Sequence, residues 1–70
     1  MFKHILYFDS PEERDAAEGW IKANFEMEDS HSAYDDTIYC FYTSVQLTER
    51  QQQIIVDTVK PSSYMTNEEM

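Results

Sequence analysis

A strong helix start follows directly after a short apolar run near the N-terminus, and this order decides the fold class. Residues Phe2–Phe8 are mostly large and apolar, and the run is too short for a helix of ordinary length. Ser10 then supplies an N-cap hydroxyl, Pro11 suits the first helical position, and Glu13 has the spacing of a capping box. The sequence therefore predicts a strand followed by a helix.

The predicted helix has one apolar face. Ala17, Trp20 and Ile21 fall at helical spacing, and charged residues line the opposite side. We expect the helix to end near Ala23 or Asn24, because the pattern after it changes from a helical period to an alternation.

The strongest strand signal lies in the middle of the chain. Residues Thr37–Val45 are dense in β-branched and aromatic side chains. The stretch Phe25–Tyr34 can pair with them as a hairpin that turns at Asp35 and Asp36. The alternative that Phe25–Tyr34 stays outside the sheet is left open, so the expected sheet has two or three strands.

A second helix start follows at Thr48, where Gln51 completes a capping-box pattern. Ile54, Ile55 and Val59 lie on the expected inner face, and Pro61 ends the helix. The remaining residues have no apolar period. We expect one compact domain over residues 1–60 and a flexible acidic tail over residues 61–70. Deletion of Ser62–Met70 is expected to leave thermal stability unchanged.

Together these elements predict a small α+β domain of the order β-α-(β)-β-α. Both helices are expected on one face of the sheet, because each has a single apolar side to bury. A sheet of only two strands is marginal in isolation, so in that case a homodimer that completes a four-stranded sheet is expected.

The charge of the chain limits its partners. The chain has fourteen acidic and five basic residues, which gives a net charge of -9. Such a surface repels free nucleic acid and anionic membranes. A single cysteine and the lack of a signal-like or membrane-spanning run lead us to expect a cytoplasmic protein.

Catalytic and metal-site patterns are weak. Five ligand-type residues lie close together, but their spacing matches no known metal loop, so neither metal nor cofactor is expected. Cys40 is interpreted as a buried apolar residue and His4 as a hydrogen-bonded residue at the edge of the core. One glycine excludes a glycine-rich phosphate loop, and we expect no enzyme. The five ligand-type residues are Glu28, Asp29, His31, Asp35 and Asp36.

The acidic surface is the feature that carries a functional hypothesis. Carboxylates held at fixed positions can imitate the phosphates of a nucleic acid and block the basic groove of a protein that binds nucleic acid. As a short, strongly acidic α+β domain without a catalytic signature, the chain resembles the class of small inhibitory proteins that phages and mobile elements direct against host nucleic-acid machinery. The candidate partner-binding residues are Glu26, Glu28, Asp29, Asp35 and Asp36.

An alternative hypothesis uses the aromatic strand. A small regulatory or adaptor domain, which could be homodimeric, would bind a protein partner through Tyr39, Phe41 or Tyr42. Salt separates the two hypotheses, because binding through charge weakens as ionic strength rises and binding through aromatic side chains hardly changes.

Overall fold

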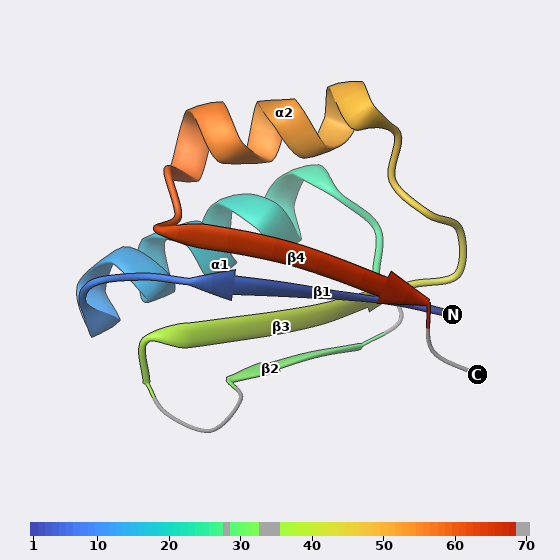
Figure 1. Ribbon diagram of the computed structural model, residues 1–70. Helices are drawn as coiled ribbons and strands as arrows, with labels where there is room; N and C mark the ends of the chain where they lie inside the picture. The colour runs from blue at the N-terminus through green and yellow to red at the C-terminus, as the bar shows by residue number, and fades with distance from the viewer. Residues whose placement is uncertain (28, 33–35, 69–70) are drawn as a thin grey trace.

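The computed structural model describes residues 1–27, 29–32 and 36–68, with the backbone alone for residues 29–32. Six elements follow one another along the chain, and Figure 1 shows their arrangement. They are β1 (Phe2–Tyr7), α1 (Pro11–Asn24), β2 (Asp29–Ser32), β3 (Ile38–Thr43), α2 (Glu49–Val59) and β4 (Ser63–Glu68).

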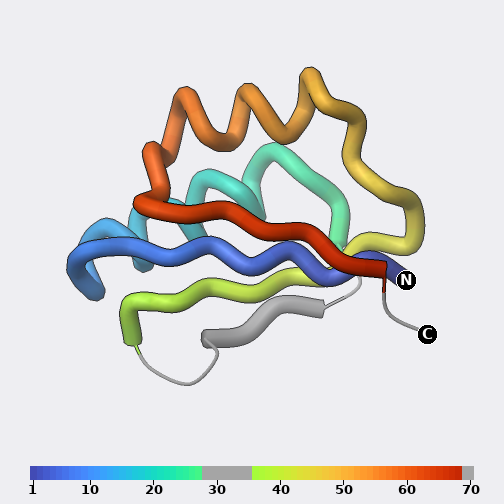
Figure 2. Tube along the Cα trace, in the orientation of Figure 1, coloured from blue at the N-terminus to red at the C-terminus, as the bar shows by residue number. Residues whose placement is uncertain are grey.

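The four strands form one antiparallel sheet in the order β2-β3-β1-β4. Both helices lie on the same side of it (Figures 1 and 2). The prediction of an α+β domain with its helices on one sheet face is therefore confirmed. With the fourth strand, the element order is that of the ferredoxin-like β-α-β-β-α-β arrangement.

The two helix starts confirm the capping predictions to different degrees. The Thr48 hydroxyl accepts from Gln51 N–H at 3.1 Å, and the Gln51 side chain accepts from Thr48 N–H at 2.8 Å, which is a complete capping box. At α1 the Ser10 hydroxyl accepts from Glu13 N–H at 3.2 Å, but the cap is formed by the serine alone. The Glu13 carboxylate therefore remains available at the surface.

The hydrophobic core lies between the sheet and the helices. Strand register places Leu6 beside Tyr39 and His4 beside Phe41, all on the helix side. Burial of a large apolar side chain contributes about 1.5–3 kcal/mol, so a few such residues account for much of the stability of so short a chain. The side chains between the two layers with no exposed surface are Leu6, Ile21, Tyr39, Phe41 and Ile55. Ile54 was also expected to face inward but is 42% exposed, because adjacent residues of a helix point in different directions and Ile55 takes the inner position.

The C-terminal segment corrects the sequence analysis. Residues 63–68 were expected in a flexible tail, but they form β4, which pairs with β1 over six residue pairs. Lys60 ends α2 in the left-handed conformation, with φ 49°, and the chain then turns back toward the sheet. Ser62 N–H donates to Tyr7 O at 2.8 Å at the start of the pairing.

The hairpin prediction is confirmed in shorter form. β2 pairs with β3 over four residues, from Asp29 opposite Tyr42 to Ser32 opposite Tyr39. The expected turn at Asp35 and Asp36 falls partly outside the described residues, and Asp36 itself lies in a turn. β1 is a central strand, with β3 on one side and β4 on the other.

Candidate functional site

The predicted acidic residues do not gather at one place. Glu26 is exposed just after α1, next to the C-terminal end of β3. Asp36 is exposed just before the N-terminal end of β3. Because β3 has six residues, the two are separated by about 20 Å of strand. Asp29 begins β2, and Glu28 and Asp35 lie outside the described residues.

Asp36 instead lies near acidic residues that the sequence analysis had not grouped with it. The Phe8 N–H donates to Thr37 O at 2.9 Å, which holds the residue after β1 next to the residue before β3. Figure 1 shows the start of α1 at this same end of the sheet. We call the four exposed carboxylates here the acidic end. They are Asp9, Glu12, Glu13 and Asp36.

Sequence reasoning missed this grouping for a physical reason. Carboxylates in a first helical turn are common because they interact favourably with the positive end of the helix dipole. Glu12 and Glu13 were therefore explained by the helix alone. One signal was available in the sequence. If β1 and β3 are antiparallel neighbours, the residues after β1 and the residues before β3 lie at the same end of the sheet.

The basic residues of α1 form ion pairs with other carboxylates of the same helix. Arg14 pairs with Asp15 at 2.8 Å and with Glu18 at 3.8 Å, and Lys22 pairs with Glu18 at 2.8 Å. The hydrogen bond to Glu18 raises the pKa of Lys22. Among the described side chains, no ion pair involves any carboxylate of the acidic end. The four carboxylates of the acidic end are therefore not tied up in ion pairs with described side chains.

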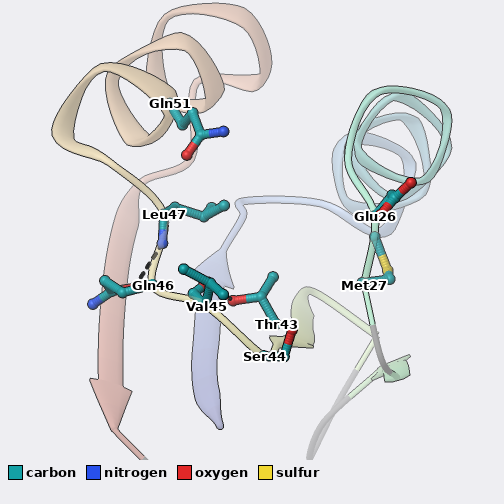
Figure 3. A pocket seen from close by; sticks show the side chains of 8 residues that line it. All are labelled: Glu26, Met27, Thr43, Ser44, Val45, Gln46, Leu47 and Gln51. Carbon is teal, nitrogen blue, oxygen red and sulfur yellow. Dashed lines mark hydrogen bonds between the residues drawn. The ribbon is translucent and has the colours of Figure 1, made fainter.

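A cavity of about 550 Å³ opens at the opposite end of the sheet, where α1 ends and α2 begins (Figure 3). Its polar walls already bond to the protein itself. The Thr43 hydroxyl donates to Val45 O at 2.7 Å, and Gln46 Oε1 accepts from Leu47 N–H at 3.1 Å. Among the described residues that line it, Glu26 is the one carboxylate, so no second described carboxylate is placed there for acid–base chemistry. The lining residues are Glu26, Met27, Thr43, Ser44, Val45, Gln46, Leu47 and Gln51.

His4 is fully buried and hydrogen-bonded through both ring nitrogens. Its Nε2 lies 2.9 Å from Thr43 Oγ1, and its Nδ1 lies 3.1 Å from Tyr64 Oη. Since the Thr43 hydroxyl donates to Val45 O, it accepts from His4 Nε2–H, and the Tyr64 hydroxyl donates to Nδ1. The ring also stacks on Phe41 at 4.6 Å. His4 is thus a hydrogen-bonded core residue, as predicted, and its two bonds join β1 to β3 and to β4.

Burial shifts the pKa values of both His4 and Tyr64. It lowers the pKa of His4 from 6.5 to about 4, because the charged imidazolium would lose its hydration. It raises the pKa of the Tyr64 phenol to about 12 for the same reason. At neutral pH the network is uncharged, which suits a structural role.

Cys40 is buried, which confirms its interpretation as a small apolar residue. Burial raises the pKa of its thiol and so disfavours the reactive thiolate. The described part of the chain contains no group of three or more potential metal ligands. Because Glu28 and Asp35 lie outside that part, the expectation that this segment binds no metal remains a prediction.

The aromatic hypothesis needs a correction. Tyr39 and Phe41 have no exposed surface, because they point into the core beneath the helices. Tyr42 lies on the other side of the sheet, which no helix covers, and the Lys3 ammonium lies 6.0 Å from its ring. Alternation along the strands defines an open sheet face that includes Ile5, Tyr7, Ile38, Tyr42 and Met65.

Comparisons with protein families, with curated proteins and with solved structures gave no match. Across the residues that the structure describes, no helix has the length and apolar character needed to cross a membrane.

Proposed function

We propose that this chain is a non-enzymatic protein-binding domain that blocks the nucleic-acid-binding surface of a basic protein. Its acidic end is the contact surface, and its carboxylates take the place of phosphates. The partner is a protein, and the domain itself binds neither free nucleic acid nor an anionic membrane. Inhibitors of this kind serve phages and mobile elements inside the host cytoplasm.

One observation carries the proposal. Four exposed carboxylates lie at one end of the sheet without an ion-pair partner among the described side chains, while Arg14 and Lys22 are engaged by other carboxylates. A basic groove gains favourable electrostatic energy from such a surface and associates with it rapidly. Glu12 and Glu13 lie in the first turn of α1. Asp9 and Asp36 each lie next to a residue of the Phe8–Thr37 hydrogen bond, which joins the ends of β1 and β3. These fixed neighbours reduce the ordering cost on binding.

The test compares two variants with the same change of charge. The first neutralises three carboxylates of the acidic end by D9N, E12Q and D36N. The matched control neutralises three exposed carboxylates elsewhere by E26Q, E49Q and E68Q. The partner is captured from a nuclease-treated lysate and purified, and displacement of labelled DNA or RNA from it is measured with each variant. Circular dichroism checks that both variants fold.

We expect the wild-type chain to displace the nucleic acid and the acidic-end variant to bind at least about tenfold more weakly, a loss of about 1.4 kcal/mol or more. The control should lose less. Binding should also weaken steeply between about 50 and 200 mM salt, as it does for contacts that replace phosphates. Simultaneous binding of nucleic acid and this chain, or equal losses in both variants, would contradict the proposal.

The open sheet face favours a second candidate function, an adaptor that binds protein through apolar contacts. Its half-exposed side chains, which include Ile38 and Tyr42, have no helix above them. Under this alternative, Y42A weakens capture of the partner, while the acidic-end variant and added salt do not.

A further inference from the structure

The sheet has two edges, and the structure protects them unequally. β2 and β4 are the outer strands, and the free N–H and C=O groups of an outer strand can pair with another chain. β2 has only four residues and includes the acidic Asp29. A short strand with a charge in it is a poor template for pairing.

β4 lacks these protective features. It has six residues, contains no proline, and has no charge before its last residue, Glu68. Met65 lies near its centre and is 48% exposed. The Thr66 hydroxyl contacts Gln46 of the β3-α2 connection at 3.2 Å, on the helix side of the sheet. The chain has a net charge of -9, whereas the first five residues of this outer strand carry no charge.

We propose that β4 pairs with β4 of a second copy of this chain. A two-fold axis perpendicular to the sheet makes the two strands antiparallel, so that each offers the same groups to the other. The two four-stranded sheets then become one continuous sheet. This inference does not depend on the proposed function.

The pleat of the strand restricts the register. Residues directly opposite each other in an antiparallel pair point to the same side of the sheet. Met65 lies on the open face and Thr66 on the helix side, so a register with Met65 opposite the partner's Met65 keeps both layers intact. It also places Ser63 opposite the partner's Asn67.

Charge favours this register. Glu68 lies opposite the partner's Ser62, so the strand carboxylates of the two copies do not face each other. Met65 is also the register partner of Ile5 within its own sheet. Pairing therefore joins the apolar residues of the two open sheet faces into a continuous row across the axis. Two paired strands bury less than the roughly 1,600 Å² of a standard interface, so the association depends on protein concentration.

The first test measures molar mass by light scattering and sedimentation over the widest concentration range that the chain tolerates. The variant M65K places two like charges opposite each other on the axis. The control I54K makes the same kind of change at a comparably exposed apolar residue of α2, since Ile54 is 42% exposed. Neither change touches the acidic end.

We expect the wild-type chain and I54K to dimerise as concentration rises. M65K should dimerise at least about tenfold more weakly, because like charges directly opposite on paired strands repel. Added salt should strengthen the dimer by screening the net charge of each copy, whereas it weakens the binding of a basic partner. A monomeric wild-type chain at every concentration, or equal dimerisation of M65K and I54K, overturns the proposal.

A second measurement tests the register. In a C40A background, M65C should form a disulfide-linked dimer under mild oxidation, because Cα atoms opposite each other in an antiparallel pair lie within disulfide range. I54C in the same background should not. A dimer that fails to crosslink through M65C overturns the register and with it the pairing proposed here.

Discussion

The two outer strands of the sheet are attached by different means. β2 pairs with β3, which follows it after a short connection, and its four residue pairs belong to a local hairpin. β4 pairs with β1 from the other end of the chain, and the N- and C-termini therefore lie at the same end of the sheet (Figure 1). β4 is also tied to the core, because the Tyr64 hydroxyl donates to the buried ring of His4.

This difference shows what an outer strand needs in order to stay in place. A local hairpin closes a short loop at little entropic cost, so backbone pairing can hold it. β4 closes a loop that spans nearly the whole chain, and side-chain contacts add to its pairing. Tyr64 packs against the core, and the Ser62 hydroxyl donates to Tyr7 O at 3.0 Å. We therefore expect changes at β4 to cost more stability than changes at β2.

The largest expected effect is that of removing β4. A chain that ends at Pro61 loses the contacts of Tyr64, exposes the edge of β1 and uncovers His4. Loss of a packed aromatic side chain alone costs about 3–5 kcal/mol, which is comparable to the whole stability of a domain this small. We expect the truncated chain to be unfolded by circular dichroism. A chain that ends at Glu68 keeps all of β4 and should remain folded, and a cooperative transition for the shorter chain would refute the assignment.

Low pH should also destabilise the contact between His4 of β1 and Tyr64 of β4. The pKa of His4 is about 4 in the folded protein and 6.5 as its ordinary value, so the unfolded chain takes up a proton first. The contribution of His4 to the free energy of unfolding has its full value above pH 6.5. It decreases as the pH drops and stops decreasing below about pH 4. The loss is up to about 3 kcal/mol.

Urea unfolding over this pH range measures the effect, with H4Q as the comparison. H4Q should lack this part of the pH dependence, although its stability at neutral pH should be lower because it loses the ring stacked on Phe41. Equal pH dependence of the two proteins would show that His4 is not the group that titrates.

A smaller loss is expected for Y64F. This change keeps the aromatic ring and removes the hydroxyl, so the buried Nδ1 of His4 loses its donor. An unsatisfied buried acceptor costs about 1–3 kcal/mol. The control is Y7F on the neighbouring strand, because the Tyr7 hydroxyl makes no hydrogen bond to any described residue. Equal unfolding midpoints in urea for Y64F and Y7F would mean that the hydroxyl does not stabilise β4.

The smallest effect is expected in β2. Ser30 lies within the strand, opposite Phe41, and S30G increases the freedom of the backbone there. Glycine in a strand costs about 0.5–1 kcal/mol relative to alanine. Urea unfolding should therefore give a loss well below that of Y64F. A larger loss would place β2 among the elements that hold the sheet together.

The grouping of the acidic residues was predicted only in part. Asp36 belongs both to the predicted set and to the acidic end, but Glu26 lies at the other end of β3. Glu12 and Glu13 were overlooked because capping and helix-dipole arguments explain acidic residues at a helix start, and Asp9 because it only marked the end of the first strand. Which acidic residues share a surface depends on where the turns of the sheet meet.

The amino-acid sequence by itself determined the elements whose signals are local. Ser10 and Thr48 start the helices through bonds to residues three positions away, and the β-branched and aromatic run around Tyr39 favours a strand in its own right. The tertiary structure alone decided the strand order, the grouping of the acidic end and the fate of the C-terminal segment. Ser63–Glu68 has no strong pattern of its own. It becomes a strand because β1 offers an unpaired edge and a buried histidine that Tyr64 can reach, and both of those partners lie about 60 residues away in the sequence.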